Sequence, residues 1–170
     1  SYDIAAFLDG VGNKLDSLRC LIISADSGSD LAYMSIFHID ILMSFLRIQD
    51  TVSLDNMLDE LMAKSHNSCA RYFKSIRLLS DSVPLDGFNL LKEFSKSPKN
   101  KPKEKLIDET YQKQLDFTQE FIDAISIDIE LGNNPIGSII SISKEFSDIS
   151  RFEKGKPAAT SFADFDKTCI

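Results

Sequence analysis

The chain has 170 residues, a net charge of −7 at neutral pH and an apolar fraction of 43%. A chain of this size and composition predicts one folded domain with a hydrophobic core. The acidic balance is unfavourable for a protein that follows nucleic-acid phosphates, and no apolar run is long enough to predict a membrane-spanning helix. We therefore expect neither nucleic acid nor a membrane among its partners.

The cysteines bear on the compartment in which the protein works. Cys20, Cys69 and Cys169 are an odd number of cysteines at wide spacing. Such a pattern does not predict a disulfide framework. Because reduced thiols are the usual state in the cytosol, we expect a cytoplasmic protein.

The N-terminal part of the sequence has the period of amphipathic helices. Apolar residues spaced three or four apart predict a first helix over residues 4–22. The polar segment 24–30 then predicts a break in the chain. Ser29 or Asp30 is expected to be the N-cap of the helix that follows.

The second predicted helix, residues 31–48, is apolar on nearly every side. A helix with so little polar surface is expected at the centre of the fold, with neighbours on several sides. A third helix is predicted over residues 54–80, with Ser53 as its N-cap. Small residues in the segment 65–70 indicate a point where another helix approaches closely.

The C-terminal part begins with a short predicted helix over residues 84–94. The segment 95–105 follows, with five lysines, two prolines and no apolar residue. This composition is typical of a mobile linker, because it cannot bury itself. Two further helices are predicted, one over residues 102–131 and one over residues 135–152.

The last two predicted helices are separated by recognisable end signals. Gly132 fits the C′ position of the first helix, and Asn134 fits the N-cap of the second. Together the patterns predict an all-α fold, a five- to six-helix bundle with a mobile basic linker near residues 95–105. We expect a single domain over residues 1–152 and an extended C-terminal tail over residues 153–170.

A histidine inside the apolar second helix raises the question of a metal site. A hairpin of the second and third helices would bring His38 and His66 to nearly the same height, with Cys69 one turn beyond. With Asp40 or another acidic residue, these side chains form a metal-site hypothesis. The spacing lacks the tight pairs of known zinc motifs. We therefore interpret His38 as a hydrogen-bonded core or interface histidine, and we expect no metal or other cofactor.

Acidic residues gather on the long helix predicted near the C-terminus. We interpret this acidic face as the partner-binding site, since it suits a protein with a basic surface. The face consists of Asp116, Glu120, Asp123, Asp128 and Glu130.

The sequence contains no nucleophile motif, phosphate-binding loop or paired metal motif. We therefore expect a non-enzymatic protein-binding module, of the toxin-neutralising immunity protein, secretion chaperone or adaptor type. A homodimer formed through the apolar excess of residues 31–48 is a further expectation. The alternative is a metal-dependent helical hydrolase acting on a nucleotide-like substrate, since clustered carboxylates on helices bind Mg²⁺ in such enzymes. Its carboxylates would be Asp59, Glu60, Glu120 and Asp123.

Overall fold

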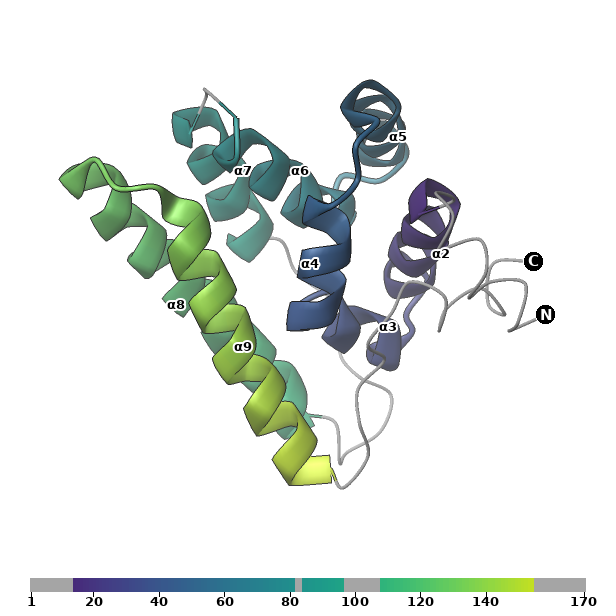
Figure 1. Cartoon of the computed structure of the whole chain (residues 1–170). Coiled ribbons are helices and arrows are strands. Elements are labelled where there is room, and N and C mark those ends of the chain that lie inside the picture. The colour runs from purple at the N-terminus through teal and green to yellow at the C-terminus, as the bar shows by residue number, and fades with distance from the viewer. Residues whose placement is uncertain (1–13, 82–83, 97–107, 155–170) are drawn as a thin grey trace.

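The computed structural model describes residues 14–81, 84–96 and 108–154, with side chains described from residue 119 to residue 148 in the last two helices. Every regular element in these ranges is a helix (Figure 1). The helices are α2 (Lys14–Asp26), α3 (Asp30–Ser35), α4 (Ile39–Leu46), α5 (Thr51–Lys64), α6 (Ala70–Leu79), α7 (Pro84–Lys96), α8 (Asp108–Leu131) and α9 (Pro135–Lys154).

The predicted all-α class is confirmed, but the expected number of five to six helices is not, because the described ranges hold eight. The start of the first predicted helix, most of the linker 95–105 and the tail from residue 155 lie outside the described residues. No helix in the described part of the chain is both long and apolar enough to cross a membrane.

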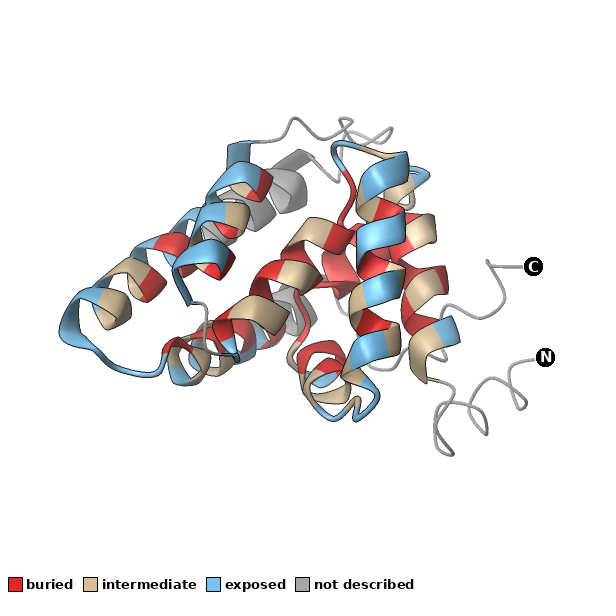
Figure 2. Cartoon of the chain, turned by 90° about the horizontal axis from the view of Figure 1, so that it is seen from above, coloured by how far each residue is buried: buried red, intermediate tan, exposed pale blue. Residues whose placement is uncertain are grey.

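The helices form a bundle in which α6 packs on α5 and α7, and the antiparallel pair α8 and α9 packs against α7 and α4. Buried residues line the inner side of each helix, and exposed residues line its outer side (Figure 2). This arrangement is what the amphipathic period of the sequence predicts.

The prediction of one helix over residues 31–48 is wrong. The chain turns at Ile36 and Phe37, and His38 adopts an extended conformation as the N-cap of α4. Its ring Nδ1 accepts a hydrogen bond from the backbone N–H of Asp40 at 3.1 Å. The buried His38 therefore caps the start of α4, which confirms the interpretation of a hydrogen-bonded core histidine.

A second N–H group at the start of α4 is satisfied from a distant part of the chain. The backbone N–H of Ile39 donates to Oγ of Ser147 at 2.9 Å. The same hydroxyl donates to the carbonyl oxygen of Ser143, one turn back on α9, at 2.8 Å. A helix start buried in this way needs such partners, since its first N–H groups have none within the helix.

The prediction of one helix over residues 54–80 is also wrong, because α5 ends at Lys64 and α6 begins at Ala70. The break is held by Asp26, at the end of α2. Its carboxylate accepts from the backbone N–H of Cys69 at 2.7 Å and from Oγ of Ser68 at 2.5 Å. Ser68 in turn accepts from the N–H of Ala70 at 3.1 Å, so one carboxylate and one hydroxyl cap the start of α6.

Other predicted end signals are mostly confirmed. Ser29 caps α3, with its side chain accepting from the N–H of Ala32 at 3.1 Å. Gly132 has a φ of +74°, and Asn134 accepts from the N–H of Ile136 at 3.0 Å. The prediction of Ser53 as a cap is wrong: Asp50 caps α5 and accepts from the N–H of Ser53 at 3.1 Å.

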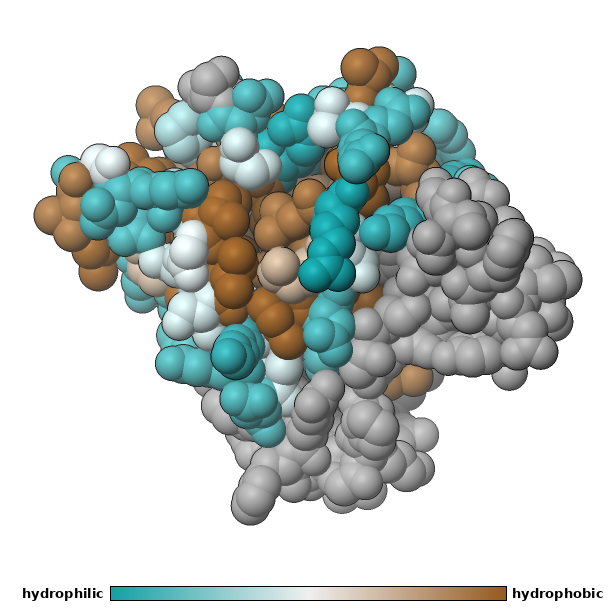
Figure 3. Space-filling model, viewed as in Figure 1, coloured by the Kyte–Doolittle hydropathy of each residue, from teal (hydrophilic) through white to brown (hydrophobic). Residues whose placement is uncertain are grey.

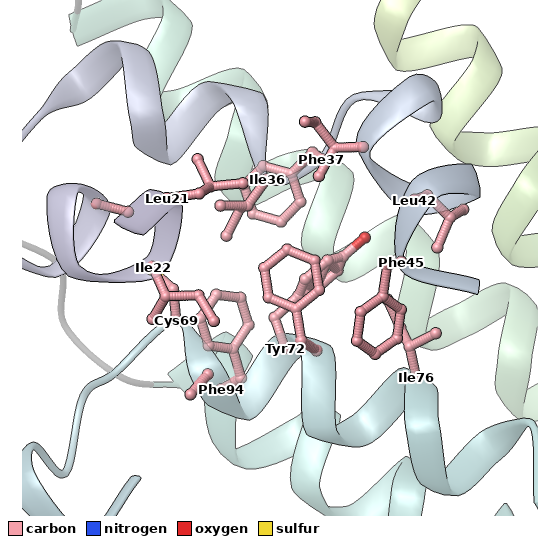
Figure 4. Packing of buried hydrophobic residues seen from close by; sticks show 14 of the residues in the cluster. Leu21, Ile22, Ile36, Phe37, Leu42, Phe45, Cys69, Tyr72, Ile76 and Phe94 are labelled. Atoms are coloured by element: carbon pink, nitrogen blue, oxygen red, sulfur yellow. The ribbon is translucent and has the colours of Figure 1, made fainter. Parts of the chain in front are cut away.

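The core is centred on the rings of Phe37, in the turn before α4, and Tyr72, on α6 (Figure 4). Their centroids lie 5.0 Å apart. Phe37 also contacts Phe146 on α9, and Tyr72 contacts Phe121 on α8. Burial raises the pKa of the Tyr72 hydroxyl well above its ordinary value. The neighbouring side chain of Ser143 lowers this pKa, but by less.

Two cysteines lie among the described residues. Cys69 is buried and carries a thiol, not a disulfide. Cys20 is disulfide-bonded, and its partner is not among the residues that the structure describes. The expectation of reduced cysteines is therefore wrong for Cys20.

Gly87 allows α7 to pack closely on α6. A Cβ atom at this position would lie 2.8 Å from Cγ and N of Leu79 and from the carbonyl oxygen of Ser75. Replacing Gly87 with Ala should therefore lower the free energy of unfolding by about 1–3 kcal/mol. Chemical denaturation would measure this loss.

Gly137 is the control for this substitution, since a Cβ atom there meets nothing within 4 Å. Gly137→Ala should raise stability by up to about 1 kcal/mol, because alanine favours the helix more than glycine does. A gain in stability for Gly87→Ala would contradict the close packing of α6 and α7.

The cap at His38 can be tested by its contribution to stability. The ring is buried, and its Nδ1 accepts the Asp40 N–H at 3.1 Å. His38→Ala removes this acceptor and should lower the free energy of unfolding by at least about 1 kcal/mol. His38→Asn, which keeps a cap acceptor, should lose less, and chemical denaturation would measure both losses.

His66→Ala is the matched control for this measurement. His66 is exposed and lies beside the guanidinium of Arg71, so its replacement should change the free energy of unfolding by no more than about 0.5 kcal/mol. A loss in the His66 variant equal to or larger than that in the His38→Ala variant would refute the role assigned to the cap.

Candidate protein-binding face

The candidate site lies on the side of α8 that points away from the bundle. Its opposite side buries Phe121 and Ile125 against the core. Exposed residues recur three or four apart on the outer side, as the period of a helix requires. We call this stripe the α8 outer face; it consists of Glu120, Asp123, Ile127, Glu130 and Leu131.

Three of the five acidic residues predicted for partner binding lie on this face. Glu120, Asp123 and Glu130 are exposed. Asp116 belongs to α8, but its side chain is outside the described residues. The structure therefore places Glu120, Asp123 and Glu130 together on one exposed face of α8.

Asp128 lies apart from the other carboxylates. It is five residues beyond Asp123, which is about 140° round a helix. Its carboxylate accepts a hydrogen bond from Oγ of Ser138 on α9. The structure thus gives Asp128 a place in the contact between α8 and α9, and not on the outer face.

The outer-face carboxylates differ in their electrostatic environment from Asp55, Asp59 and Glu93 on neighbouring helices. Within the part of the chain that the structure describes, no ion pair includes Glu120, Asp123 or Glu130. The hydrogen bond described for Asp123 comes from a neutral side chain: Nε2 of Gln119 donates to its carboxylate at 3.0 Å. Three negative charges therefore face solvent, and none of the described cations lies beside them.

Acidic residues on α5 and α7, by contrast, face a row of cations on α6. Lys74 lies 3.3 Å from Asp55 and 3.2 Å from Asp59. Arg71 lies 3.0 Å from Glu93. These pairs are part of the packing between neighbouring helices and leave less negative charge for a partner.

The residues of the metal-site hypothesis have other roles. His38 is buried and caps α4, whereas His66 is exposed, with its Nδ1 3.0 Å from the guanidinium of Arg71. Cys69 is buried at the start of α6. The described residues contain no group of three or more histidine, cysteine, aspartate or glutamate side chains placed to hold a metal ion.

Two of the four carboxylates assigned to the alternative hydrolase, Asp59 and Glu60, form ion pairs with lysines. Asp59 pairs with Lys74, and Glu60 pairs with Lys64 at 2.9 Å. The hydrogen bond from Lys64 lowers the pKa of the Glu60 carboxyl, and the charge of that lysine lowers it further. Cations thus occupy the carboxylates that would bind a metal ion with Glu120 and Asp123.

The sequence matches no known protein family, and neither a characterised protein nor a solved structure matches the chain. The site is therefore defined by its own geometry.

Two residues of the outer face were not among the predicted site residues. Ile127 and Leu131 are exposed large hydrophobic side chains in phase with Asp123 and Glu130. The helical period could have identified them, because positions three and four apart share one face. The same period would have separated Asp128 from the set.

The different places of Asp128 and Asp123 can be tested by stability measurements. Asp128→Ala removes the acceptor of the Ser138 hydroxyl and should lower the free energy of unfolding by about 1–2 kcal/mol. Asp123→Ala should change it by no more than about 0.5 kcal/mol, since the side chain is at the surface. Equal losses in urea denaturation would contradict the assignment of Asp128 to the hairpin contact.

Proposed function

We propose that the chain is a non-enzymatic protein-binding module and that its α8 outer face binds a partner with a basic surface. The observation that supports this proposal is the row of exposed carboxylates Glu120, Asp123 and Glu130, which have no described cation beside them. A partner supplying lysine or arginine would gain attraction over the length of this row. Such a module would be of the immunity protein, secretion chaperone or adaptor type, as expected from the sequence.

Charge of this kind acts first on the rate of encounter. An unbalanced acidic stripe attracts a basic partner over roughly a Debye length, about 8–10 Å at physiological salt. The chain as a whole is acidic, with a net charge of −7. Binding should therefore weaken as salt is added, which distinguishes it from purely apolar association.

The other expectations are supported to different degrees. The metal-dependent hydrolase stays the alternative, although Asp59 and Glu60 are paired with lysines. A homodimer through α4 has less support, since Ile41, Leu42 and Phe45 are buried within the chain itself. The disulfide at Cys20 counts against a cytoplasmic location, because such bonds are rare in the cytosol.

Affinity capture of the full chain from its native lysate tests the proposal. A variant with Glu120, Asp123 and Glu130 changed to Lys should lose a stoichiometric partner that the parent retains, because the row becomes repulsive. The captured proteins would be identified by mass spectrometry and compared at low and high salt.

The matched control changes three exposed acidic residues on other helices, namely Asp16, Asp86 and Glu145, to Lys. Both variants have the same net charge, so an effect confined to the α8 variant locates the binding face. Retention of the partner by the α8 variant, or an equal loss in both variants, would contradict the proposed site.

A further inference from the structure

The α8 outer face combines its charges with an apolar pair. Ile127 is 56% exposed and Leu131 is 68% exposed. They are one helical turn apart, about 6 Å along the axis. Two large hydrophobic side chains exposed on the same face of one helix are unusual among the described residues.

The other large exposed hydrophobic residues are placed differently. Leu31, Val52 and Leu85 are each the second residue of a helix and belong to three different helices. Single apolar residues at a surface are common and need no explanation. Only α8 has two of them in phase on one face, among the residues described.

The charges surround this apolar pair. Asp123 lies one turn before Ile127, and Glu130 lies between Ile127 and Leu131 in the sequence, with Glu120 one turn further back. Hydrophobic and hydrophilic side chains accordingly meet at the tip of the α8–α9 hairpin (Figure 3). A surface of this composition matches a segment that is itself apolar on one side and basic at its edges.

We infer that the α8 outer face docks an amphipathic, basic helix of another protein. Apolar residues of that helix, spaced i and i+4, contact Ile127 and Leu131, and its lysines or arginines pair with Glu120, Asp123 and Glu130. This inference rests on the proposed function and names the class of partner segment. Apolar contact supplies affinity, while the carboxylates set orientation and favour basic partners over acidic ones.

Two other occupants fit the surface less well. A second copy of the chain would bring the same carboxylates against each other, and like charges in an interface repel. The chain's own segment 95–105 has five lysines but no apolar residue. It matches the charges and leaves Ile127 and Leu131 without a partner.

A synthetic helix tests this inference without the natural partner. The probe is a fluorescent peptide of about 18 residues made of leucine and lysine, with all leucines on one helical face. A peptide of the same composition in scrambled order is its control. In fluorescence anisotropy with the full chain, the amphipathic peptide should bind about tenfold more tightly than the scrambled one.

Paired substitutions locate the binding. Ile127→Ser with Leu131→Ser should weaken binding of the amphipathic peptide about tenfold, since each removes exposed apolar area. Val52→Ser with Leu85→Ser removes comparable exposed residues elsewhere and should leave binding unchanged. Circular dichroism and thermal melts would establish that all variants are folded.

Several results would overturn the inference. They are equal binding of the two peptides, no binding of either, and loss of binding in the Val52 and Leu85 variant. Unchanged binding in the Ile127 and Leu131 variant would overturn it too, and so would a concentration-dependent dimer in sedimentation that this variant abolishes. The proposed function is judged separately, by the capture experiment with the Lys variants, so it can stand where this inference fails.

Discussion

The architecture depends on satisfying backbone N–H groups where two helices begin inside the core. At the start of α4, the ring of His38 and the hydroxyl of Ser147 accept those hydrogen bonds. At the start of α6, Asp26 and Ser68 do the same. A buried N–H group without a partner costs about as much as several good contacts gain. The two breaks are tenable only because these acceptors are in place, and the first break puts Phe37 at the centre of the bundle.

Much of the fold follows from local patterns, and the breaks do not. The helical period predicts the amphipathic faces, and Gly132 and Asn134 predict the turn between α8 and α9 because their chemistry is local. Ser147 lies 108 residues from Ile39, and Asp26 lies 43 residues from Cys69. Such acceptors are identified only once the chain is folded. An apolar run without glycine or proline therefore reads as one helix even where the fold divides it.

The candidate site shows the same division between local and tertiary information. The acidic character of α8 is evident from the sequence, and the exposed positions of Glu120 and Glu130 agree with it. The separate place of Asp128 needs the helical phase, and its bond to Ser138 needs the hairpin. Which carboxylates lack a cation depends on the neighbours of Lys74 and Arg71, and these are brought together only by the packing of α5, α6 and α7.

Ser147 belongs to α9, yet it accepts the first N–H of α4. Movement of the α8–α9 pair away from the bundle would break that hydrogen bond and expose the amide of Ile39 to water. Exchange of this one amide proton with solvent therefore reports the local opening of the hairpin, separately from global unfolding. A partner that engages α8 while the hairpin is seated would slow that exchange, and one that needs the hairpin released would speed it. The hydrogen bond between Ile39 and Ser147 is thus also a natural probe of the stability of the contact between α4 and α9.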